Sequence, residues 1–251
     1  MSKDFDNIVN MLLSQIMGSM KEDARRQCEL YLRSACQKHL FAVARLRSLS
    51  GRIAYHRREG KVEEAEQLEG YQVVLCPPNR PAVEEMDFDH CVMSLRSSLE
   101  HLAQLVNAVI PLNLPSKGKA SEAVSLKRVT DEIANRQSLK SIPPLSKLFK
   151  YLHKEMDKDW YKQLHDLRIE MFHDKSGRLV RVEILTLGGN LKDLKFLHLA
   201  DTATGETAFD RDVRGYCGAT AHHVKRVLNR SFHYLSRYLS YKLGNAWLQQ
   251  L

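Results

Sequence analysis

The sequence lacks the short signatures of several enzyme classes. It contains no GxxxxGK[ST] or GxGxxG phosphate loop, no HExxH zinc motif and no Cys/His set at zinc-finger spacing. It also contains no local signature around a serine or cysteine nucleophile. These absences argue against a standard nucleotide-binding loop, a zinc hydrolase and a hydrolase of the nucleophile-elbow type. No metal site and no cofactor are expected.

Cysteine is scarce, and its spacing does not indicate a disulfide framework. The chain has 5 cysteines, none in a CxxC pair. The number is odd and no secretory signal precedes them, so we expect reduced, mostly buried thiols. No stretch approaches the roughly 18 apolar residues of a membrane span. The sequence therefore predicts a cytoplasmic protein that does not enter a membrane.

Basic residues are in surplus. Lys and Arg number 38 against 30 Asp and Glu, which gives a formal charge of +8 and a pI near 9.2. Such a balance suits a polyanionic partner such as nucleic acid or a membrane surface, although a soluble protein can also simply be basic. The 43% hydrophobic residues are enough for a folded core.

Apolar residues recur at helical spacing along most of the chain. We expect helices near residues 5–16, 21–59, 87–110, 125–137, 145–156, 159–174 and 212–243. Asp87 or Asp89 is a plausible cap for the third of these. The run "CPPNRP" stops a helix, and "SIPP" predicts a second break. Residues 61–74 are compatible with a further helix or an antiparallel return.

The pattern changes after Gly177. The alternating runs "RLVRVEILTL" and "LKDLKFLHLA", joined by "GGN", predict a β-hairpin, and "DTATGETAF" is a third short strand or a loop. The predicted fold is mainly α: a helical bundle with a small β-hairpin, at about residues 178–200, inserted before the C-terminal helix. Residues 1–80 are expected to pack on or belong to the bundle, whose main domain is residues 86–251.

Two segments place an arginine five residues before a histidine. Arg168 and His173 lie in "QLHDLRIEMFHDKSG", and Arg96 and His101 lie in "MSLRSSLEHLAQ". A guanidinium can hold a phosphate bidentately, and an imidazole can transfer protons near neutral pH. Residues five apart on a helix differ by about 140° in rotation, so convergence needs a frayed helix end or a second, symmetric copy of the motif.

The segment "LHDLRIEMFHD" resembles the Arg-x4-6-His signature of the HEPN superfamily, and "DFDHCVMSLRSSLEHLAQLVNAV" looks like an earlier core helix of such proteins. The resemblance covers roughly residues 87–250. It implies a HEPN-like bundle with metal-independent endoribonuclease activity, commonly in toxin or defence systems, from a composite site at a homodimer interface. Arg168 and His173 would be catalytic, and the products would end in 2′,3′-cyclic phosphates. An antitoxin or other regulatory protein is a possible partner.

One position departs from the family pattern. Active members usually carry a polar residue, often Asn, directly after the arginine, and here that position is Ile169. The alternative is therefore a catalytically inactive member that binds RNA or a partner protein, and a third possibility is a structural helical adaptor. Supporting roles are assigned to Asp166, Glu170, Arg96 and His101. For Arg96 an ion pair with Glu100 is the simpler reading.

The last predicted helix carries basic residues with tyrosines between them. Basic groups hold phosphates while exposed aromatic rings stack on unpaired bases, although a solvated helix edge has the same composition. The predicted RNA-binding residues are Lys225, Arg226 and Arg230, and the alternative cluster is Arg45, Arg47, Arg52, Arg57 and Arg58. His222 and His223 are adjacent and therefore point about 100° apart on a helix, which disfavours a shared metal ion.

Overall fold

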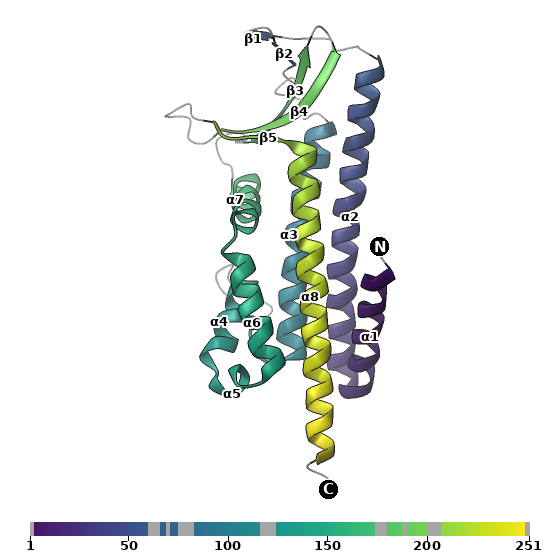
Figure 1. Cartoon of the computed structure of the whole chain (residues 1–251), viewed down its shortest axis with the longest axis vertical. Helices are drawn as coiled ribbons and strands as arrows, with labels where there is room; N and C mark the ends of the chain where they lie inside the picture. The colour runs from purple at the N-terminus through teal and green to yellow at the C-terminus, as the bar shows by residue number, and fades with distance from the viewer. Residues whose placement is uncertain are drawn as a thin grey trace. The chain divides into compact units, whose positions relative to one another are not determined.

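The computed structural model describes residues 3–59, 66–68, 71–74, 83–115, 124–173, 180–187, 190–199 and 207–248. Side chains are described within these ranges except in the strands and at residues 3, 51–59, 83–86, 169–173, 213 and 245–248. The described residues are mainly α-helical, as predicted (Figure 1). They divide into two compact units. The first combines Met1–His39, Ser97–Lys162 and His223–Leu251, and the second combines Leu40–Arg96 and Gln163–His222.

In the first unit, α1 (Lys3–Ser19) runs alongside the start of α2 (Glu22–Glu59), as Figure 1 shows. The end of α3 (Val83–Val109) and most of α8 (Val213–Leu248) complete this bundle. The rings of Phe5 and Phe232 meet in the core, with centroids 6.0 Å apart. The Ser98 hydroxyl donates to the Ala35 carbonyl at 2.7 Å, which joins α3 to α2. The bundle is thus held by apolar packing with a buried polar link.

The apolar residues that recur at helical spacing along α3 form one buried face. They are Leu95, Leu99, Leu102, Leu105 and Val106. The apolar pattern of α2 is less regular, and its Leu40 is 42% exposed. A long helix with many alanines and arginines carries a weak apolar stripe, so single positions on it are poorly specified.

Three shorter helices follow in the same unit: α4 (Leu126–Asn135), α5 (Gln137–Lys140) and α6 (Pro143–Met156). Ser125 caps α4, with its hydroxyl oxygen accepting from the Arg128 N–H at 3.3 Å. The predicted break at "SIPP" is the beginning of α6, because Pro143 and Pro144 occupy its first turn. Proline is tolerated there, since the first-turn N–H groups have no partner within the helix.

In the second unit, Asp87 lies inside α3 and does not cap it, so that prediction was wrong. Its buried carboxylate accepts from the Ser48 hydroxyl at 2.8 Å and from the Arg45 guanidinium at 3.1 Å. Both donors belong to α2. The rings of Phe88 and Tyr216 contribute to the core of this unit, with centroids 6.4 Å apart.

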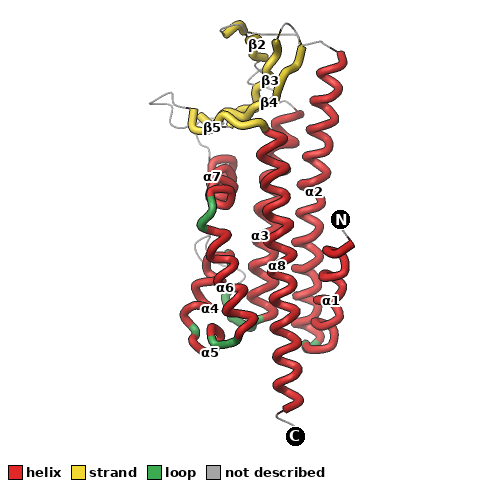
Figure 2. The backbone as a smooth tube through the Cα atoms, in the orientation of Figure 1, coloured by secondary structure: helices red, strands yellow, loops and turns green. Residues whose placement is uncertain are grey.

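The second unit also contains α7 (Asp159–His173) from Gln163 onward and a five-stranded sheet (Figure 2). The strands are β1 (Glu66–Leu68), β2 (Tyr71–Val74), β3 (Val180–Leu187), β4 (Asn190–Leu199) and β5 (Thr207–Asp212). They pair antiparallel in the order β1-β2-β3-β4-β5. The hairpin predicted at about residues 178–200 is not seen as a small hairpin, because its two strands, β3 and β4, pair within this larger sheet. Val74 pairs with Ile184, and periodicity within one segment cannot reveal so distant a partner.

Four described cysteines are buried and belong to no disulfide: Cys28, Cys36, Cys91 and Cys217. Burial raises the pKa of the Cys28 thiol to about 11, and burial together with the Asp6 charge raises that of Cys36 to about 12. Both thiols are protonated at neutral pH and behave as small apolar groups. Cys76 lies outside the described residues. None of the described helices has both the length and the apolar character required to cross a membrane.

Candidate functional site

The structure places Arg168 and His173 on the same helix. Both lie on α7, and His173 is its last residue. Leu164 and Leu167 are buried, and Arg168 follows them at the border of this face with a half-buried side chain. Asp166 is exposed. The side chains of Ile169, Glu170 and His173 lie outside the described residues. The convergence of the Arg168 guanidinium and the His173 imidazole therefore stays a prediction.

The upstream pair has a different environment. Arg96 is only 6% exposed. His101 is half-buried and stacks on Tyr31, with ring centroids 6.5 Å apart and planes 29° apart. Burial and the Lys38 charge lower the pKa of His101, against an opposing effect of Glu100. The ring is therefore neutral at pH 7, and its role as a support for catalysis stays a prediction.

The three predicted RNA-binding residues of α8 differ in what they contact. Lys225 lies with its ammonium 5.9 Å from the centroid of the Phe5 ring. The Arg226 guanidinium pairs with Glu155 at 3.4 Å and is half-buried. Arg230 is exposed, and its guanidinium carbon lies 5.7 Å from the centroid of the Tyr151 ring. Among these three residues, Arg230 is the best placed to meet a ligand.

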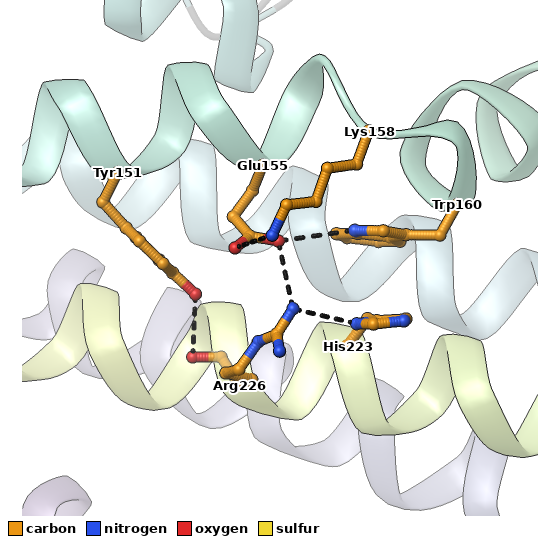
Figure 3. A network of polar contacts seen from close by, with 6 residues as sticks. All are labelled: Tyr151, Glu155, Lys158, Trp160, His223 and Arg226. Atoms are coloured by element: carbon orange, nitrogen blue, oxygen red, sulfur yellow. Dashed lines mark hydrogen bonds and ion pairs between the residues drawn. The ribbon is translucent and has the colours of Figure 1, made fainter.

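Glu155 is the centre of a polar network that the sequence analysis missed (Figure 3). Glu155 is 5% exposed as a residue, and its carboxylate lies between α6 and α8 in the first unit. It accepts from the Lys158 ammonium at 2.7 Å, from the Trp160 indole N–H at 3.4 Å and from the Arg226 guanidinium at 3.4 Å. A buried carboxylate requires such donors, because its desolvation is costly.

The charges of this network shift two pKa values. Burial alone would raise the pKa of Glu155, but the Lys158 hydrogen bond, the Arg226 and Lys158 charges and the Trp160 hydrogen bond together lower it. Glu155 is therefore ionised at neutral pH. Burial and the nearby Glu155 charge raise the pKa of Tyr151 to about 12, against opposing effects of Arg226 and Arg230. Tyr151 keeps its proton, and its hydroxyl donates a hydrogen bond to the Arg226 carbonyl at 3.4 Å.

His223 closes the network on the α8 side. Its ring stacks on the Trp160 indole, with centroids 5.3 Å apart and planes 14° apart. The Arg226 guanidinium lies 3.0 Å from the Nδ1 atom of His223. Since a guanidinium can only donate, Nδ1 accepts, and the imidazole in this arrangement is neutral with its proton on Nε2. The network thus fixes Arg226 in place, which leaves less of its charge for a polyanion.

A signal for this network was present in the sequence. Leu145, Leu148 and Leu152 are buried on one face of α6, and Glu155 continues the same spacing three residues later. An acidic residue at a core position predicts a buried partner. The sequence alone does not identify that partner, because Arg226 lies 71 positions away.

Comparisons with models of known families, with curated proteins and with solved structures gave no match to this chain.

Proposed function

We propose that this chain is a HEPN-like, metal-independent endoribonuclease in which Arg168 and His173 act on one RNA linkage. The observation that supports the proposal is the position of the pair on α7. Arg168 borders the buried face with a side chain that is only half-buried, and His173 ends the helix. Arg168 is therefore not fully enclosed in the buried face of the helix, as a purely structural residue would be.

The chemistry follows from the two residue types. His173 takes the proton from a ribose 2′-hydroxyl, which attacks the adjacent phosphorus. Arg168 holds the non-bridging oxygens and stabilises the charge that builds in the transition state. The 5′-oxygen takes a proton from water as it leaves, so one product ends in a 2′,3′-cyclic phosphate and the other in a 5′-hydroxyl. DNA is not a substrate, because it lacks the 2′-hydroxyl.

A homodimer belongs to the same proposal, because residues 168 and 173 are separated by about 140° around a helix and a symmetric second copy supplies the missing partner. A toxin-like activity in the cytoplasm, restrained by an antitoxin or another regulatory protein, is the biological setting that the HEPN resemblance implies. The second candidate is RNA binding without cleavage. It is favoured by Ile169 and by the exposed Arg230 on α8.

Cleavage of a labelled single-stranded RNA pool in the presence of EDTA tests the proposal. Wild-type protein should give cyclic-phosphate ends from RNA and nothing from DNA of the same sequence. His173→Ala should lower the rate by about 100-fold or more, because general acid–base catalysis contributes at least that factor. Arg168→Ala should have an effect of similar size, while Arg168→Lys, which keeps the charge but loses the fork, should retain more activity.

The matched control is His153→Ala, since His153 is an exposed histidine of α6 outside the proposed site. Its cleavage rate should equal that of the wild type, and thermal melting should show all variants folded. If the wild-type protein does not cleave RNA, with or without divalent ions, the endoribonuclease proposal fails and RNA binding without cleavage is the remaining candidate. A His173→Ala variant that cuts as fast as the wild type would remove this histidine from the mechanism.

A further inference from the structure

A cavity of about 370 Å³ lies in the first unit among α1, α6 and α8. Ile8 of α1 and Lys147 of α6 line it, together with five residues of α8 that begin at Asn229 and end at Arg237. The volume is in the range of small-molecule sites. The cavity is open to ligands, because the side chains of Lys147, Arg230 and Arg237 at its wall are exposed.

The charge of the wall is of one sign. Lys147, Arg230 and Arg237 are positive at neutral pH, and none of the described lining residues is acidic. In the described part of the chain none of these three cations forms an ion pair with a carboxylate. His233 also lines the cavity. Burial and the positive charges of Arg237 and Arg230 lower its pKa, as expected beside these cations. Converging cations repel one another, and a bound anion relieves that repulsion.

The neighbouring aromatic residues hold this wall in place. The Arg230 guanidinium lies over the Tyr151 ring, which packs at 57° to the Tyr234 ring with centroids 6.2 Å apart. Tyr151 is itself anchored by its hydrogen bond to the Arg226 carbonyl. A guanidinium held against an aromatic ring loses less freedom on binding than a mobile one. Tyr234 also lines the cavity, and an aromatic side chain at such a position can stack on a ring of the ligand.

Asn229, one of the lining residues, carries a buried polar atom without a described partner. The Oδ1 atom of Asn229 is buried and accepts no hydrogen bond from any residue that the structure describes. A buried acceptor left without a donor costs about 1–3 kcal/mol, so it is normally satisfied by water or by a ligand. A ribose hydroxyl or an exocyclic amino group has the donor that this oxygen needs.

We propose that this cavity is a binding site for a phosphate monoester joined to a flat ring. The phosphate is held by Arg230, Arg237 and Lys147, the ring lies against Tyr234, and a donor group reaches Asn229. A terminal monoester carries nearly two negative charges, whereas a backbone diester carries one, so three uncompensated cations favour the monoester. A free 5′-nucleotide and the 5′-phosphorylated end of an RNA share this chemistry. The proposal does not depend on RNA cleavage by α7.

Calorimetric titration of the full chain with AMP, UMP, adenosine and inorganic phosphate tests the site. AMP and UMP should bind, adenosine should bind at least about 10-fold more weakly, and inorganic phosphate should bind weakly because it lacks the ring. The double variant Lys147→Gln/Arg237→Gln should weaken AMP binding at least about 10-fold. Tyr234→Ala should weaken AMP but leave inorganic phosphate unchanged.

The matched control is Lys127→Gln/Lys150→Gln, which removes two exposed charges of the same unit that do not line the cavity. It should bind AMP as the wild type does. An independent readout is the imidazole resonance of His233, whose pKa should rise when AMP binds. Thermal melting identifies any variant that fails to fold. In that case the His233 titration of the wild-type protein, with and without AMP, tests binding at the cavity by itself.

RNA oligonucleotides with and without a 5′-phosphate separate the two sources. If the phosphorylated strand binds more tightly and the Lys147→Gln/Arg237→Gln variant loses this preference, the ligand is an RNA end. If both strands bind equally, the ligand is the free nucleotide. Failure of AMP, UMP and phosphorylated RNA to bind, or equal affinity for AMP and inorganic phosphate, overturns the proposal. Nucleotide binding by a protein that leaves RNA uncut would end the endoribonuclease proposal and keep this one.

Discussion

At the scale of single residues, Glu155 shows how one buried charge determines what its neighbours can do. Its carboxylate fixes Lys158, Trp160 and Arg226, so a basic residue that the sequence assigned to RNA has an internal partner. Arg230, four residues further along α8, is exposed and lines a cavity. Neighbouring basic residues on one helix therefore have different surroundings, which composition alone does not distinguish.

Glu155→Gln should destabilise the protein by about 2 kcal/mol, because it removes the charge that compensates Arg226 and Lys158. Urea unfolding of both proteins at pH 7 measures the difference. The matched control is Glu132→Gln on α4. Glu132 pairs with Arg136 at 2.5 Å, but that pair is partly exposed, so the loss should stay below about 1 kcal/mol. Equal losses in the two variants would show that burial of the Glu155 network adds nothing.

The difference in unfolding free energy between the wild type and Glu155→Gln should depend on pH. The pKa of Glu155 in the folded protein is lower than its ordinary value of 4.5. A lowered folded pKa means that the ionised form stabilises the fold, fully above about pH 4.5 and progressively less as the pH falls through the lower folded pKa. The gap in unfolding free energy between wild type and Glu155→Gln should therefore narrow under acid conditions. A gap that widens as the pH falls would contradict the assigned network.

At the scale of elements, local chemistry sets the boundaries of the short helices. Ser125→Ala should destabilise the protein by about 1 kcal/mol, because the first turn of α4 loses the oxygen that accepts from the Arg128 N–H. Ser125→Asp, which keeps an acceptor, should restore most of that stability. Urea unfolding measures both variants. A Ser125→Asp protein no more stable than Ser125→Ala would show that the cap does not matter for α4.

The helices were predictable from sequence because their signals are local. Apolar spacing and proline gave α2, α6 and α8 close to their observed bounds. The sheet was only partly predictable. The segments that form β3 and β4 alternate, whereas β1 pairs with β2, and β2 in turn pairs with β3 more than a hundred positions away. The Glu155 network and the α8 cavity share this limit. Each joins α6 to α8, and no single window of sequence contains both sides.

At the scale of the whole molecule, the charge surplus is informative only after internal pairs are subtracted. The chain carries 38 basic and 30 acidic residues. Arg45 and Arg226 are paired with buried carboxylates, whereas Lys147, Arg230 and Arg237 gather at a cavity without one. A polyanion gains most from the second kind of cation, because no internal pair must be broken to reach it. Part of the surplus positive charge therefore lies at this cavity, in the side chains of Lys147, Arg230 and Arg237.

The proposed homodimer makes a prediction for the assembled molecule. If Arg168 of one copy works with His173 of the other, the single variants Arg168→Ala and His173→Ala are each inactive. A mixed dimer of the two nevertheless contains one intact pair, because symmetry places the remaining arginine opposite the remaining histidine. Random re-association of equal amounts should restore about one quarter of the wild-type cleavage rate, since half of the dimers are mixed and each has one working site of two. Sizing chromatography of the mixture confirms that dimers have re-formed. Re-formed dimers that stay inactive would show that the pair acts within one chain or not at all.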